Sequence, residues 1–124
     1  MMQSKIPGRI LIVEDEKPMA HALELKLSHA GFEAHSVQNG EEAVALLKTD
    51  SFDLIILDLV MPKLDGFGVL EALSADKKSV PVIVLSNLSQ EEDEKRAREL
   101  GAKDFFIKSN TPIAEIVKRV QKML

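Results

Sequence analysis

The chain has 124 residues, which suits a single domain, and it contains no cysteine, which excludes disulfides, the usual zinc sites and thiol catalysis. Its net charge of −4, with both signs spread along the chain, disfavours nucleic acid, which attracts clustered Lys and Arg. Residues 1–8 lack the apolar core of a signal peptide and no apolar run is long enough for a membrane span, so we expect a cytoplasmic protein with a leader at 1–8, a domain at 9–124 and no contact with membrane.

Five apolar runs alternate with five amphipathic segments. The runs that predict strands are residues 9–13, 32–37, 54–57, 82–85 and 105–107. The segments with helical periodicity lie at 17–30, between the Asn39-Gly40 turn and Lys48, around 69–73, at 89–100 and at 113–124. The aliphatic run at 54–57 is typical of a strand buried on both faces, although a buried helical segment has the same pattern. The alternation predicts an α/β fold with a five-stranded parallel sheet and helices on both faces.

Capping and turn residues mark several helix ends. Gly31 suits the C-terminal cap of the first helix, and Asp65 suits the N-cap of the third. Residues 89–92 match a capping box that opens the fourth helix. The apolar residues of this fourth helix are chiefly Ala97 and Leu100, so we expect it to pack weakly and to move when the domain is modified.

Polar residues follow four of the predicted strands. Because ligands of open α/β sheets bind beyond the carboxyl ends of the strands, we expect these residues to converge at one edge: Asp15, Asp58, Ser86 and Lys108. Each alone has a simpler interpretation, such as a turn residue before Pro62, a surface charge or an acid at a solvated helix N-terminus. Their convergence favours a functional site.

The residue types in this set suit phosphoryl chemistry. The crowded carboxylates of Glu14, Asp15 and Asp58 repel one another, so they are expected to hold a hard cation, Mg²⁺ or Mn²⁺. Phosphoryl oxygens can fill the open metal positions, while Lys108 supplies positive charge and Ser86 a donor. Asp58 is then the candidate nucleophile, which would form an aspartyl phosphate.

Four stretches in this order and spacing, ILIVEDE, LDLVMPKLDG, VLS and GAKDFFIKS, resemble the receiver domain of two-component response regulators (the CheY-like superfamily) from Arg9 onward. The resemblance implies a flavodoxin-like, doubly wound (βα)5 fold with strand order 2-1-3-4-5. It implies that Asp58 accepts a phosphoryl group, with Mg²⁺, from a sensor histidine kinase or phosphotransfer protein in a phosphorelay. Such a domain assists its own phosphorylation and dephosphorylation, is no turnover enzyme, and signals to a protein effector through the face made by helix 4, strand 5 and helix 5.

The resemblance also implies a role for each site residue. The implied metal ligands are Glu14, Asp15 (the more direct of these two), Asp58 and the backbone carbonyl of Val60. The implied phosphoryl-binding groups are Ser86, the backbone of Asn87, and Lys108. The implied switch residues are Ser86 and Phe105, the latter at an aromatic position that changes rotamer on phosphorylation.

Four positions depart from the family pattern. Phe105 stands where many receivers have Tyr, so a phenolic hydroxyl is unavailable. Ser109 replaces the proline that usually follows the lysine through a cis bond; because a cis bond costs a non-proline residue about 3 kcal/mol, we predict a trans Lys108–Ser109 peptide. Asn87 replaces a small residue, and its bulk is expected to alter phosphoryl access. Val60 offers no side-chain group that positions an attacking water, which predicts slow dephosphorylation.

Other functions fit less well. A phosphatase of the haloacid dehalogenase group needs an acid two residues after the nucleophile, where this chain has Lys17 after Asp15 and Val60 after Asp58. A flavin-binding electron carrier is disfavoured because the acids at 14–16 would repel a cofactor phosphate. The remaining alternative is a degenerate receiver that acts as a phosphorylation-independent protein-binding module.

Overall fold

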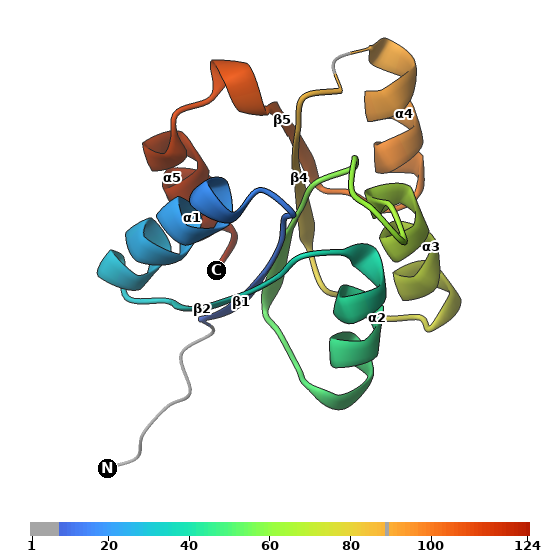
Figure 1. The fold of residues 1–124 in the computed structure, drawn as a ribbon, viewed down its shortest axis with the longest axis horizontal. Coiled ribbons are helices and arrows are strands. Elements are labelled where there is room, and N and C mark those ends of the chain that lie inside the picture. Colours follow the sequence, from blue (N-terminus) through green and yellow to red (C-terminus); the bar gives the residue numbers. More distant parts are fainter. Residues whose placement is uncertain (1–7, 89) are drawn as a thin grey trace.

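Five parallel strands alternate with five α-helices in the computed structural model, which describes residues 8–88 and 90–124 (Figure 1). The strands are β1 (Arg9–Val13), β2 (Glu33–Val37), β3 (Leu54–Leu57), β4 (Val82–Ser86) and β5 (Asp104–Ile107). The helices are α1 (Lys17–His29), α2 (Gly40–Thr49), α3 (Gly66–Ala75), α4 (Glu91–Glu99), the 3-10 helix η1 (Lys108–Asn110) and α5 (Ile113–Met123). The sheet order is β2-β1-β3-β4-β5, which confirms the predicted flavodoxin-like topology. Across the described residues, no helix is long and apolar enough to cross a membrane.

The central strand of the sheet is β3. It lies between β1 and β4, and all four of its residues are buried, so the run at 54–57 is a strand and not a helical segment. Ile55 and Leu57 belong to a core shared with α2, α3 and α4, whereas Leu54 and Ile56 belong to a second core shared with α1 and α5. Figure 1 shows the same division, with α1 and α5 on one side of the sheet and the other three α-helices on the opposite side. The period-two alternation of β3 therefore supplies both cores.

Two predicted helix caps are confirmed and one predicted turn is wrong. Gly31 follows α1 with φ +98°, a conformation that glycine adopts without a side-chain penalty. The Asp65 side chain caps α3 by accepting a hydrogen bond from the backbone N–H of Gly68 at 2.9 Å. Asn39 does not form a separate turn with Gly40. It is the N-cap of α2, because its side-chain oxygen accepts the backbone N–H of Glu42 at 2.9 Å.

The fourth helix packs as weakly as its composition predicts. Ala97 is the buried residue of α4. Leu100, at the C-cap, is partly buried against the same core, and Gly101 follows with φ +112°. Ser89, the first residue of the predicted capping box, lies outside the described residues, and the N-cap position of α4 is occupied by Gln90 without a side-chain hydrogen bond. A helix that buries so little apolar surface gains little free energy from its contacts with the sheet.

Candidate functional site

The carboxyl ends of β1, β3, β4 and β5 surround a cavity of about 310 Å³. Its lining residues are Asp15, Glu16, Asp58, Val60, Ser86, Asn87, Leu88 and Lys108. The four residues predicted to converge at this edge therefore do so. The convergence follows from parallel strands, whose carboxyl ends lie on the same edge of the sheet.

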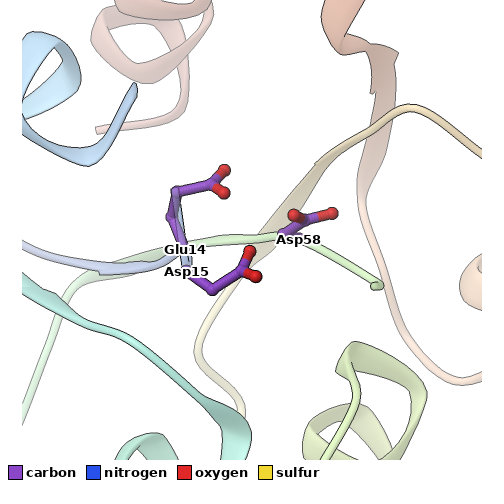
Figure 2. A group of neighbouring side chains, drawn as sticks. All are labelled: Glu14, Asp15 and Asp58. Atoms are coloured by element: carbon purple, nitrogen blue, oxygen red, sulfur yellow. The ribbon is translucent and has the colours of Figure 1, made fainter. Parts of the chain in front are cut away.

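Three carboxylates meet beside this cavity. Each of Glu14, Asp15 and Asp58 offers an oxygen within 4.8 Å of the others, and Figure 2 shows that two come from the end of β1 and one from the neighbouring β3. Glu14 and Asp58 are buried, whereas Asp15 is exposed. The backbone N–H of Asp58 donates to the carbonyl of Val13 at 3.0 Å, and that of Glu14 to the carbonyl of Val37 at 3.0 Å. The sheet ladder thus continues past the strands and fixes the backbone that carries these acids.

Lys108 reaches back into this acidic cluster from the end of β5. Its side chain is only 7% exposed, and its Nζ lies 2.9 Å from Oε1 of Glu14, 2.8 Å from Oε1 of Glu16 and 2.9 Å from Oδ2 of Asp58. An ammonium has three N–H donors and no acceptor. The three carboxylates therefore engage the whole donor capacity of Lys108.

Glu16 is a site residue whose role the sequence did not reveal. Its side chain is 59% exposed, yet it makes the shortest of the three ion pairs with Lys108. Glu16 is the N-cap residue of α1 but makes no side-chain capping bond, which leaves its carboxylate free to turn toward the cavity. The available signal was its position as the third acid of the run that ends β1, and a run of acids is equally typical of a solvated helix start.

Burial and ion pairing act against each other on the titration of this cluster. Burial raises the pKa of Glu14 to about 7, and the negative charge of Asp58 adds to this rise. Hydrogen bonds from Lys108 and from the backbone of Glu16 act in the opposite direction and lower the pKa. Burial by itself would lower the pKa of Lys108, but its hydrogen bonds to the carboxylates outweigh that effect and raise its pKa. Lys108 is therefore a permanent cation at neutral pH, and Glu14 exchanges its proton near neutral pH.

The carboxylate of Asp58 is held from two directions. One oxygen accepts from Lys108, and the other accepts from the backbone N–H of Val60 at 3.3 Å. The Val60 side chain is exposed, and the residue lies on the cavity wall. A side chain at Gly66 would collide with the carbonyl oxygen of Asp58, so glycine there lets α3 begin directly against the strand end that carries the site.

The last residue of β4 and the loop after it form another part of the cavity wall. Ser86 is fully buried, and its hydroxyl oxygen accepts the backbone N–H of Leu88 at 3.4 Å. The side-chain oxygen of Asn87 accepts the backbone N–H of Ser109 at 3.1 Å. No cis peptide occurs between described residues, which confirms the predicted trans bond between Lys108 and Ser109.

Phe105 lies on β5, where it is the register partner of Val84 of β4. It is partly buried and packs against the core shared with α2, α3 and α4.

Comparison with known proteins matches residues 10–121 to the response regulator receiver domain family. The receiver domain of Francisella response regulator 1452 is 30% identical, with 94% of this chain and 95% of that chain covered and a TM-score of 0.88. Response regulator protein TrrA from Thermotoga maritima, solved in complex with Mg²⁺-BeF, is 31% identical, with 94% and 99% covered and a TM-score of 0.83.

A curated relative extends beyond the length of this chain. The "Probable transcriptional regulator ycf27" of Porphyridium aerugineum is 38% identical over 120 residues, which are 92% of this chain and 50% of the relative. The chain thus spans about half the length of this relative. With the family matched over nearly its whole length and the fold shared with solved receivers, the chain belongs to the response regulator receiver domain family, the signalling domains of two-component systems.

Proposed function

We propose that the chain accepts a phosphoryl group on Asp58 from the phosphohistidine of a sensor histidine kinase or phosphotransfer protein, in a Mg²⁺-dependent reaction of the cytoplasm. The observation that carries this proposal is the position of the Asp58 carboxylate, buried at the cavity between two further acids and the ammonium of Lys108. In the transfer, an Asp58 oxygen forms an O–P bond while the P–N bond of the donor breaks, and the imidazole leaves with the bonding electrons.

Lys108, Ser86 and the backbone of Asn87 are the proposed phosphoryl-binding groups. Lys108 already contacts Asp58 at 2.9 Å, so a phosphoryl group attached there would fall within reach of its ammonium. Ser86 and Asn87 line the same cavity and offer a hydroxyl and a backbone N–H. Positive charge and fixed donors of this kind stabilise the charge on transferring phosphoryl oxygens.

Glu14, Asp15, Asp58 and the carbonyl of Val60 are the proposed ligands of Mg²⁺, and Mn²⁺ suits the same oxygen donors. The three carboxylate oxygens lie close enough together for a shared cation, and Val60 lies on the cavity wall beside them. The bound ion would neutralise charge between these carboxylates and the phosphoryl oxygens. The Mg²⁺-BeF complex of TrrA supports this choice of ion for the related protein.

The domain would act as a switch that assists its own dephosphorylation and not as a turnover enzyme. The exposed Val60 side chain has no group that positions a water, so we propose a long-lived phosphoryl group.

A phosphoryl group on Asp58 would draw Ser86 toward the phosphoryl oxygens and let Phe105 change rotamer. The weakly packed α4 would then shift, and the face formed by α4, β5 and α5 would bind a protein effector.

The partners that we propose for these residues are proteins. The ycf27 relative is called a transcriptional regulator, and this chain matches half of it. Within the chain, acidic and basic residues are mixed, and the net charge is −4. Direct contact of these 124 residues with nucleic acid is therefore not part of the proposal.

A phosphorylation-independent binding module is the second candidate. It is favoured by one observation, that the chain's own carboxylates engage all three donors of Lys108. A site that satisfies itself in this way is stable without a phosphoryl group, as a module that uses the fold only for protein binding would require.

Intact mass separates the two candidates. The native chain and Asp58→Asn would each be incubated with acetyl phosphate and Mg²⁺, with an EDTA-treated sample beside them. The receiver mechanism predicts one phosphate adduct on the native chain, lost in Asp58→Asn and in EDTA. No adduct on folded native protein, with acetyl phosphate or with a phosphorylated histidine kinase as donor, would contradict the proposal and favour the binding module.

A further inference from the structure

The hydrogen bond between Asn87 and Ser109 joins two loops that border the site. Oδ1 of Asn87, directly after β4, accepts the backbone N–H of Ser109, inside η1 after β5, at 3.1 Å. The two residues are 22 positions apart in the chain. Ser86 and Ile107 are the last partners in the β4–β5 register, so the bond joins the residue directly after β4 to the second residue after β5.

This bond satisfies a donor that η1 cannot satisfy itself. The first N–H groups of any helix have no partner within the helix, and Ser109 lies in the first turn of η1. The residue at the N-cap of η1, Ile107, makes no side-chain capping bond. Asn87 thus caps η1 from the loop after β4, which a side chain without an acceptor oxygen could not do.

The capped residue adjoins Lys108, whose ammonium has to reach the acidic cluster. The amide that links Lys108 to Ser109 is planar, so fixing the N–H of Ser109 also fixes the orientation of the Lys108 carbonyl. A proline at 109 would have no N–H to offer, so this contact is available only because another residue stands there. The two departures from the family pattern, at 87 and 109, are therefore one hydrogen-bonded pair.

We propose that Asn87 is a positioning residue. It holds η1 through the backbone N–H of Ser109 and so orients the side chain of Lys108 toward Asp58. The inference rests on the proposed phosphoryl transfer for its effect on rate. The orientation of the Lys108 side chain can be tested without that reaction. Asn87 also adjoins Ser86, so the same bond keeps the phosphoryl-binding wall and Lys108 at a fixed separation.

Two NMR readouts test the positioning directly. Asn87→Ala should speed hydrogen exchange at the Ser109 amide and shift the Lys108 Cε resonances, while Asn87→Asp, which keeps an acceptor oxygen, should restore slow exchange. Asn110→Ala, in the same 3-10 helix, is the matched control and should change neither signal. Unchanged Lys108 resonances in Asn87→Ala would overturn the proposal even if phosphorylation of the native chain proceeds.

A double-variant cycle tests the route of the effect. Loss of a hydrogen bond of this kind should slow adduct formation from acetyl phosphate about three- to tenfold in Asn87→Ala. In a Ser109→Pro background, which has no N–H at 109, the same substitution should have no further effect. An equal loss in both backgrounds would show that Asn87 acts by another route and would overturn the proposal. Absence of any adduct on the native chain would count against the phosphoryl transfer and leave the NMR readouts to decide the positioning role.

Discussion

The ammonium of Lys108 lies 2.8 Å from the carboxylate of Glu16. Of the three carboxylates that pair with Lys108, only that of Glu16 is mostly exposed. Returning an exposed carboxylate to water has a small free-energy cost, whereas leaving a buried carboxylate unpaired has a large one. If Lys108 turns a donor toward a phosphoryl oxygen, as proposed, Glu16 is therefore the partner that it would release. Glu16 would then compete with the incoming group for the same N–H.

Glu16→Ala should accelerate phosphorylation of Asp58. Removal of the competing carboxylate frees one donor of Lys108 and reduces the negative charge at the cavity, and exposed ion pairs of this kind correspond to a change of about two- to fivefold in rate. Adduct formation from acetyl phosphate, followed by intact mass, measures the effect. Glu41→Ala removes an equal charge from the first turn of α2 and should leave the rate unchanged. A slower reaction in Glu16→Ala would show instead that Glu16 is needed to hold Lys108 in place.

Lys108→Met should destabilise the fold in the absence of a divalent cation. Glu14 and Asp58 would keep their buried positions without the ammonium that neutralises them, and breaking a buried ion pair costs about 3 kcal/mol in free energy of unfolding. Urea denaturation in EDTA measures the loss. Mg²⁺ should restore part of it, because an ion that binds only the folded state stabilises that state. Lys103→Met is the control on an exposed lysine; if both variants lose the same stability, the ion-pair explanation is wrong.

The pKa of Glu14 predicts a pH dependence of stability. Its folded-state pKa of about 7 lies above the ordinary value of 4.5, so the folded state binds the proton more tightly than the unfolded chain does. The free energy of unfolding should therefore fall as the pH rises from about 4.5 to about 7, and Glu14→Gln should lack this part of the slope. Urea titrations of both proteins in EDTA give the difference. Parallel pH profiles for the native chain and the variant would contradict it.

Mg²⁺ affinity should follow the same titration in the opposite sense. A protonated Glu14 cannot serve as an anionic ligand, so the apparent affinity should weaken as the pH falls below about 7. Isothermal titration of the native chain and of Glu14→Gln, at matched pH values, measures this. A pH-independent affinity in the native chain would place Glu14 outside the metal site.

Gly66→Ala should destabilise the domain and displace Asp58, although alanine is the better helix former by about 1 kcal/mol. The added methyl group would collide with the Asp58 carbonyl oxygen, which is backbone and cannot turn aside. Overpacking of this kind costs about 1–3 kcal/mol. Gly68→Ala is the matched control in α3, because its methyl group would meet the flexible end of the Leu64 side chain. Equal stability of the two variants, from urea denaturation, would contradict the prediction.

The fold and the composition of the site were predictable because both depend on chain order and strand ends. Each apolar run ends where polar residues begin, and parallel strands bring those ends together, so the meeting of Asp58 with Lys108 needed no side-chain detail. The role of Glu16 needed more, since it depends on which way its side chain turns at the start of α1. The contact between Asn87 and Ser109 depends on the β4–β5 register and on the 3-10 turn, neither of which leaves a periodic signal.

The central position of β3 also sets an order of local stabilities. Backbone amides of a strand that is covered on both faces and paired on both edges exchange with solvent only when most of the domain unfolds, whereas those of a helix anchored by little more than Ala97 exchange through small openings. The residue proposed to receive the phosphoryl group thus follows the last element to open, and the helix proposed to respond is among the first. Rearrangement of α4 can proceed many times without exposing the core on which the geometry around Asp58 depends.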